Sequence, residues 1–115
     1  MKLIHRAIFV KRKEFFKILD REGSDRLRVL LEIDKGELIS IVVQYESIID
    51  GKWIPIVRYD VEHGFFHRDM MTPKGEKIKT QIDITDLKSA TIYAEQDIKD
   101  KWDFYKQKYL KGLKK

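Results

Sequence analysis

The stretch VRYDVEHGFFHRDM, at residues 57–70, gathers the side chains of this sequence that could do chemistry. Within about a dozen positions it holds two histidines, two arginines, two aspartates and a tyrosine. Histidine exchanges protons near neutral pH, and arginine can hold a phosphate through two parallel hydrogen bonds. Ribonucleases that use the ribose 2′-hydroxyl need little more than such a proton-transfer group and such a phosphate-binding group. The first hypothesis is therefore metal-free acid–base chemistry on a phosphodiester.

This hypothesis assigns a role to each candidate catalytic residue. Arg58 and Arg68 would hold the phosphate. His67 or His63 would move the proton, and Asp60 would orient a histidine or an arginine. A β-hairpin brings facing residues of its two strands within about 5 Å, so several of these groups could converge. Which of them converge depends on the pairing register, because a one-residue slip moves every side chain to the other face.

Two other interpretations of the stretch stay open. Two histidines and one carboxylate can make an open metal site. The histidines would be His63 and His67, with the carboxylate from Asp60 or Asp69. Gly64 and the two phenylalanines after it favour a turn and a strand over a metal-binding helix, so the sequence predicts no metal and no cofactor. Alternatively, the residues pair with one another in a polar hairpin that carries no chemistry.

The elements that position this stretch follow from the spacing of apolar residues. Between residues 27 and 82, short alternating runs are separated by turns that contain glycine or proline, which is typical of β-strands. In residues 86–110 the apolar residues recur every three or four positions, with Thr85 or Asp86 available as N-cap, which predicts one helix. The fold class is α+β: an antiparallel meander sheet of four to five strands with a long C-terminal amphipathic helix packed across it.

The N-terminal segment, residues 1–23, is predicted to contain a short basic helix. In VKRKEFFKILDRE, apolar pairs lie three and four positions apart among basic residues, and Gly23 is available as a C-terminal cap. No linker or internal repeat interrupts the chain, so the sequence predicts a single domain over residues 1–115.

The formal net charge of +5 is unevenly distributed. The excess of basic residues lies in the two ends, residues 1–28 and 101–115, and the middle is acidic. A basic segment can attract a polyanion, so Lys11, Arg12 and Lys13 are candidate binding residues for RNA. The alternative is that these lysine-rich faces are simply solvated.

Several classes of protein are excluded by composition. The chain has no cysteine, which rules out disulfides, thiolate catalysis and cysteine-ligated zinc. No run of apolar residues is long enough to span a membrane, and no signal-peptide pattern opens the sequence. We therefore expect a cytoplasmic protein with no membrane partner.

Part of the sequence carries a family resemblance. QYESIIDGKWIPIVRYDVEHGFFHRD, followed by TPKGEK and the terminal helix, resembles a family of small, mostly archaeal and bacterial proteins of unknown function over roughly residues 40–110. The core RYD, a short gap and then His also resembles the strand motif of TumE-type toxins of toxin–antitoxin systems, which are small α+β proteins with an antiparallel sheet.

The toxin resemblance implies a growth-inhibiting protein that binds or cleaves RNA and is neutralised by a cognate antitoxin-like protein. It rests on the residues that match the motif: Arg58, Tyr59, Asp60, His63 and His67. Tyr59 is on this ground a candidate binding residue. The chain departs from the motif at Val61, where TumE-type sequences have an asparagine, and this departure bears on catalysis more than on fold.

Two functions of different classes follow. The first is a toxin-like protein that binds or cleaves RNA by metal-free acid–base chemistry. The second is a non-enzymatic protein-interaction module, dimeric through a sheet edge or through the aromatic face of the helix. The enzyme requires histidine and arginine to converge at an open pocket, whereas the module requires an exposed apolar surface.

Overall fold

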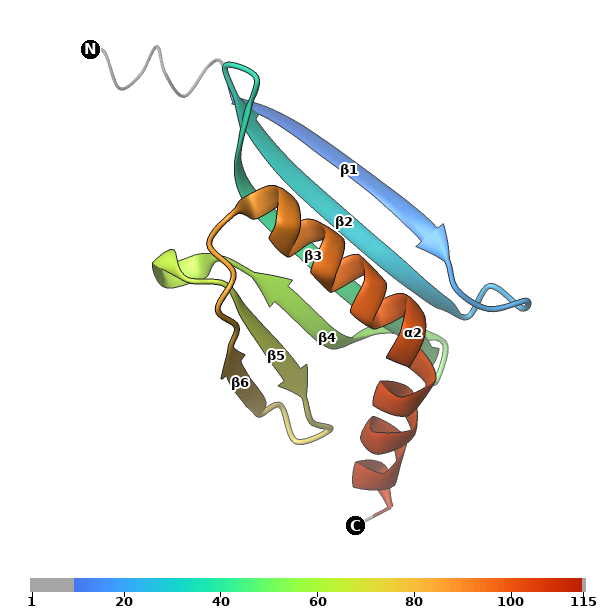
Figure 1. Ribbon diagram of the computed structural model, residues 1–115. Helices are drawn as coiled ribbons and strands as arrows, with labels where there is room; N and C mark the ends of the chain where they lie inside the picture. The colour runs from blue at the N-terminus through green and yellow to red at the C-terminus, as the bar shows by residue number, and fades with distance from the viewer. Residues whose placement is uncertain (1–9, 115) are drawn as a thin grey trace.

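The computed structural model describes residues 10–114, which form one six-stranded antiparallel sheet and one long helix (Figure 1). The strands are hydrogen-bonded in the order in which they occur in the chain, so the sheet is a simple meander. The elements are β1 (Val10–Ile18), β2 (Asp25–Asp34), β3 (Glu37–Ile49), β4 (Lys52–Asp60), the short 3₁₀ turn η1 (Glu62–Gly64), β5 (His67–Met71), β6 (Lys77–Gln81) and α2 (Leu87–Leu113).

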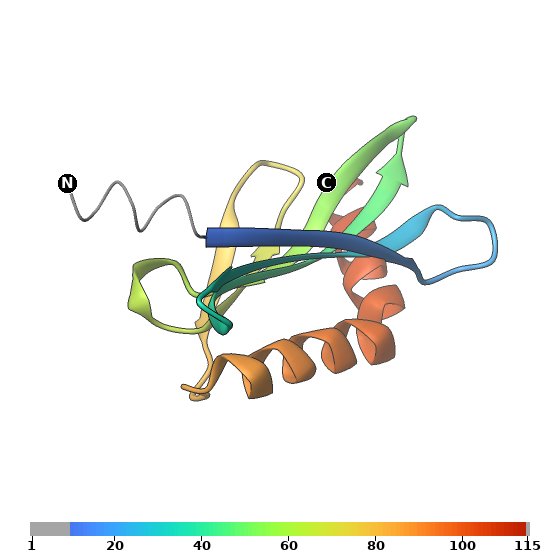
Figure 2. The ribbon, with the colours of Figure 1, turned by 90° about the horizontal axis from the view of Figure 1, so that it is seen from above.

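The helix α2 covers one face of the sheet, and the core lies between these two layers (Figure 2). Alternate side chains of the central strands point at the helix, as the two-residue period of a strand requires. Ala90 and Ala94, both fully buried, are small enough to let the helix backbone approach the sheet closely. The buried apolar residues of the core are Leu27, Val29, Ile41, Val43, Tyr45, Ile56, Val57, Tyr59, Phe66, Ala90, Ala94, Ile98 and Tyr105.

The α+β class, the antiparallel sheet and the C-terminal helix are confirmed. The helix begins one residue after its predicted start, with Asp86 as N-cap accepting a hydrogen bond from the Ser89 backbone N–H, and it ends at Leu113. Within residues 10–114, no helix combines the length and the apolar character that crossing a bilayer requires.

Two parts of the fold prediction are wrong: the sheet has six strands rather than four to five, and the predicted basic helix is the strand β1. The apolar pair Phe15 and Phe16 fits a helical face, but neighbouring residues of a strand point to opposite faces, and that is their arrangement here. Lys17 reaches the helix and pairs with Glu95 at 3.2 Å. Pairing with β2 along the whole of β1 overrides the local spacing. Residues 1–9, the rest of the predicted N-terminal segment, lie outside the described residues.

Buried tyrosines donate hydrogen bonds where the helix meets the sheet, and the bond of Tyr59 joins the two layers directly. Tyr59 of β4 and Tyr105 of α2 both donate their hydroxyl hydrogen to the carboxylate of Asp97. Tyr45 of β3 donates in the same way to Asp25, at 2.6 Å. Each buried hydroxyl thereby obtains a partner, which removes the cost of burying it.

These contacts raise the pKa of all three tyrosines. Burial is the largest cause in each case, and the neighbouring carboxylate adds to it because it disfavours a phenolate beside it. The pKa of Tyr105 is raised to about 12, and the pKa values of Tyr45 and Tyr59 are raised further.

We predict that the free energy of unfolding falls as the pH rises from about 10 to about 12. In the unfolded chain the tyrosines lose their protons near pH 10. In the folded protein Tyr105 keeps its proton up to about pH 12. The unfolded state therefore binds fewer protons in this window, which favours unfolding as the pH rises. Urea denaturation at several pH values measures the slope. Tyr105→Phe should show a shallower slope than the parent, and an equal slope in both proteins would contradict the assignment.

Candidate functional site

The pairing of β4 with β5 decides which side chains of the polar stretch meet. Arg58 lies opposite Asp69, and Asp60 lies opposite His67. Directly opposed residues of antiparallel strands point to the same face. Tyr59, between Arg58 and Asp60 in β4, contacts α2, so all four side chains lie on the opposite face of the sheet, which we call the open face.

One ion pair and two close contacts of His67 link the four side chains of this cluster. Arg58 Nε donates a hydrogen bond to Asp60 Oδ2 at 2.8 Å. His67 Nε2 lies 2.9 Å from Asp60 Oδ1 and 3.5 Å from Asp69 Oδ2. His67 Nδ1 lies 3.2 Å from the carbonyl oxygen of Phe65, which can only accept, so this nitrogen carries the ring hydrogen. The ligand-capable atoms of Asp60, His67 and Asp69 lie within 4.8 Å of one another, so these three residues could hold a metal ion.

Three side chains of the cluster are buried although they lie on the open face, and Arg58 is partly exposed. His67 has an exposed fraction of 0%, and Asp60 and Asp69 of 3% each. The Phe65 ring lies 5.3 Å from the His67 ring, centre to centre, and is tilted against it. A substrate phosphate could not reach His67 in this arrangement, because a proton-transfer group must lie within hydrogen-bond reach of the atom it serves.

The structure brings together three of the five predicted catalytic residues, namely Arg58, Asp60 and His67. His63 lies apart, exposed in the turn η1 with a φ of 69°. Arg68 points to the helix side, where its guanidinium lies 3.4 Å from the Tyr105 hydroxyl. Arg58 and Arg68 therefore occupy opposite faces of the sheet, so the two predicted phosphate-holding residues do not converge.

The predicted binding residues are also separated. Tyr59 is fully buried under the helix, where its hydroxyl contacts Asp97. Arg12 pairs with Glu32 at 3.0 Å. Lys11 and Lys13 line an open hollow of about 580 Å³ near the β2–β3 turn, together with Ile33, Lys35 and Gly36.

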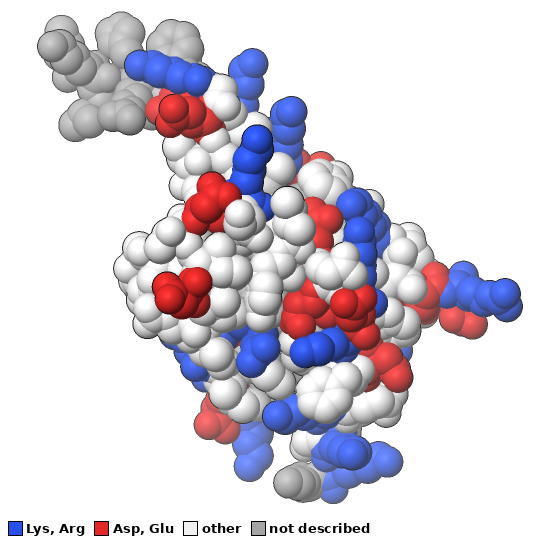
Figure 3. Space-filling view, viewed as in Figure 1, with Lys and Arg blue, Asp and Glu red and all other residues white. Residues whose placement is uncertain are grey.

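Acidic residues neutralise the arginines of the open face. The four pairs are Arg12–Glu32, Arg28–Glu14, Arg26–Glu46 and Arg58–Asp60, with nitrogen–oxygen distances of 2.7–3.0 Å. Side chains already engaged in such pairs are poorly placed to hold a phosphate. On the helix-bearing face, acidic and basic side chains are interspersed, with basic ones gathered toward the C-terminal end of α2 (Figure 3).

Sequence reasoning missed one feature of the open face. The guanidinium of Arg26 lies between two aromatic rings, 4.3 Å from the centre of Phe16 and 3.8 Å from that of Trp53. The residues come from three different strands, so no local spacing reveals the arrangement. Asp69, which the sequence analysis considered only as a possible metal ligand, belongs to the cluster as well, as its alternation with His67 along one strand indicates.

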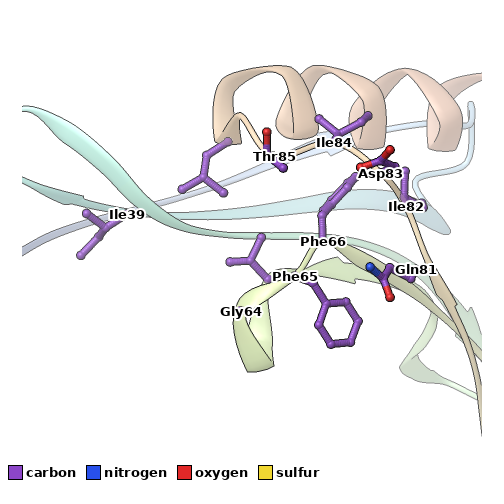
Figure 4. A pocket seen from close by; sticks show the side chains of 11 residues that line it. Ile39, Gly64, Phe65, Phe66, Gln81, Ile82, Asp83, Ile84 and Thr85 are labelled. Carbon is purple, nitrogen blue, oxygen red and sulfur yellow. The ribbon is translucent and has the colours of Figure 1, made fainter.

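A separate cavity of about 310 Å³ lies between η1, the end of β6 and the start of α2 (Figure 4). Its walls are mostly apolar, and the close-up shows Phe66 directed toward the helix and Phe65 away from it. Asp83 is the one ionisable side chain among the described residues that line it. This cavity therefore lacks the paired acid and base that the ribonuclease hypothesis requires.

Comparison with known protein families gives one match. A family model described as a domain of unknown function (DUF7718) matches residues 10–115, which include every described residue. No curated protein and no solved structure matches the chain. An uncharacterised family is thus confirmed, whereas none of these comparisons connects the chain to TumE-type toxins.

We predict that the two histidines of the stretch differ sharply in their effect on stability. His67→Ala should lower the free energy of unfolding by about 2–5 kcal/mol, because it leaves a cavity in place of a fully buried ring. His63→Asn should change it by less than about 0.5 kcal/mol, since His63 is exposed and asparagine tolerates a positive φ. Chemical denaturation of both variants measures the difference, and a small effect of His67→Ala would contradict the buried arrangement.

Proposed function

We propose that this chain, which belongs to the DUF7718 family, is a protein-interaction module that binds an acidic, extended segment of a partner along the edge strand β1. The proposal rests on the length, the one-sided pairing and the exposure of β1. This strand is nine residues long, pairs on one side with β2, and has exposed side chains from Lys11 to Ile18. An edge strand of this length is a template on which another extended chain can add a strand.

The direction of the backbone groups of β1 supports this mode of binding. The backbone N–H of Leu19, directly after the strand, donates to the Asp25 carbonyl of β2 at 2.8 Å. Backbone groups alternate in direction along an antiparallel strand, so Arg12, Glu14 and Phe16 direct their N–H and C=O groups away from β2. Within residues 10–114, no strand pairs with this row of donors and acceptors.

The side chains of β1 favour an acidic partner over a second copy of this chain. The strand carries four basic residues and one acidic residue, Glu14. Arg12 and Lys17 already pair with Glu32 and Glu95, so the attraction rests on Lys11 and Lys13. Pairing two such strands would bring like charges together, which is destabilising, whereas a partner with glutamate or aspartate would be attracted. Exposed Phe15, Phe16 and Ile18 add apolar surface for alternate side chains of the partner.

The rival hypothesis of metal-free RNA cleavage has weaker support. His67 is buried, and Arg58 and Arg68 lie on opposite faces of the sheet. Incubation of the protein with a mixed RNA substrate and EDTA, beside His67→Ala, tests this hypothesis directly. Cleavage by the parent alone would favour the enzyme over the interaction module.

We predict that the protein binds a capped peptide of alternating glutamate and valine and that added salt weakens the binding. Fluorescence anisotropy of the labelled peptide measures the affinity. Glu14→Pro removes an outward N–H from the middle of β1 without removing a hydrogen bond to β2, so it should weaken binding roughly tenfold or more.

Glu14→Ala is the matched control, because it makes the same loss of charge but keeps the backbone N–H. It should bind the acidic peptide at least as well as the parent protein. A peptide of alternating lysine and valine tests the charge preference. Equal binding of both peptides, or equal binding by Glu14→Pro and Glu14→Ala, would contradict the proposal.

A further inference from the structure

We propose that Asp60, His67 and Asp69 form a site for one divalent metal ion, with Zn²⁺ preferred, that ties β4 to β5. The three side chains come from two paired strands and point to the open face. They offer one imidazole nitrogen and the oxygens of two carboxylates, and all three residues are buried. The site is separate from the β1 edge and does not depend on it.

The spacing of the donor atoms suits a metal ion. Zn²⁺ binds nitrogen and oxygen ligands at about 2.0–2.2 Å, so two of its ligand atoms lie about 3.0–3.5 Å apart at angles between octahedral and tetrahedral. His67 Nε2 lies 2.9 Å from Asp60 Oδ1 and 3.5 Å from Asp69 Oδ2. Small rotations of the side chains would bring these atoms around one ion.

Two buried atoms of the site lack a hydrogen-bond partner. They are His67 Nε2 and Asp69 Oδ1. Nε2 is close to Asp60, but the contact does not have the angle of a hydrogen bond. Leaving a buried polar atom unpaired is costly, and buried polar atoms are nearly always paired. A metal ion between the three side chains would give both atoms a partner, with Asp69 contributing either one oxygen or two.

The hydrogen bonds that His67 and Asp60 make to surrounding groups are typical of metal-binding residues. His67 Nδ1 donates its hydrogen to the Phe65 carbonyl oxygen, which leaves the lone pair on Nε2. Metal-binding histidines commonly donate their second ring hydrogen to a carbonyl or a carboxylate in this way. Arg58 holds the other oxygen of Asp60 at 2.8 Å, and the Glu62 backbone N–H donates to Oδ1 at 3.0 Å. These hydrogen bonds fix the orientation of the His67 ring and of the Asp60 carboxylate.

Charge balance also favours a cation. Two buried carboxylates and the partly exposed guanidinium of Arg58 leave one negative charge when the imidazole is neutral, and Lys79, opposite Asp69 in β6, is exposed to solvent. An uncompensated buried charge is strongly unfavourable. The compensating cation is either a metal ion or a second proton on His67, and the experiment must distinguish these two. With nitrogen and oxygen donors the affinity order of divalent ions places Zn²⁺ above Mn²⁺.

Isothermal titration calorimetry of the full chain, prepared without a histidine tag and stripped with EDTA, tests the proposal. We expect one Zn²⁺ per chain, with Mn²⁺ binding more weakly. Asp69→Asn should weaken Zn²⁺ binding at least tenfold, because even the loss of a group that only supports a ligand costs roughly 10- to 100-fold. Asp50→Asn, which makes the same charge change in the exposed β3–β4 turn, should bind as the parent does.

A second measurement uses the unaltered protein, so it holds even where Asp69→Asn does not fold. The ¹⁵N resonances of the histidine rings are recorded before and after Zn²⁺ is added. Coordination should shift Nε2 of His67, and the rings of His5 and His63 serve as internal references. Absence of Zn²⁺ binding, binding that Asp69→Asn leaves unchanged, or a His67 Nε2 resonance of a protonated ring that Zn²⁺ does not alter would each overturn the proposal.

Discussion

The register between β4 and β5 is the constraint on which the polar half of this structure depends. Because Asp60 pairs with His67 and Arg58 with Asp69, four charged or ionisable groups lie on one face, where contacts join Arg58 to Asp60 and His67 to both aspartates. A shift of one residue would instead place Arg68 beside Asp60 and send His67 under the helix. The register also places Arg68 opposite Tyr59 on the other face, where Arg68 lies 3.4 Å from the Tyr105 hydroxyl of α2. One pairing thus positions both the polar cluster and the contact of β5 with the helix.

Charged side chains have different partners on the two faces of the sheet. Under the helix, aspartates accept hydrogen bonds from tyrosines, and Lys106 of α2 pairs with Asp25 of β2 at 3.1 Å. On the open face, three arginines pair with acidic residues of neighbouring strands, and Arg58 pairs with Asp60 of its own strand. Most of the interior charge is therefore committed to holding the fold together. The backbone edge of β1 is not committed in this way, which is why we assign the binding function to that edge.

The sequence predicts the parts of the fold that local spacing determines. The helix from Leu87 is identified by apolar residues on one face and by its Asp86 cap, and the strands β2 to β6 by alternation between turns. The strand β1 was missed because Phe15 and Phe16 satisfy a helical and an extended pattern equally well, and pairing with the distant β2 decided between the two. The burial of His67 could not be predicted from local sequence either, because it depends on the register between β4 and β5 and on the ring of Phe65.

The free edge of β1 is the central claim, and amide hydrogen exchange measured by NMR tests it most directly. The amides of Lys13, Phe15 and Lys17 point toward β2 and should exchange slowly, while those of Arg12, Glu14 and Phe16 should exchange fast. This alternation is the result that a strand paired on one side requires. Slow exchange at all six amides would mean that the edge is already covered, and fast exchange at all six would mean that β1 is not a stable strand. Either result would contradict the account.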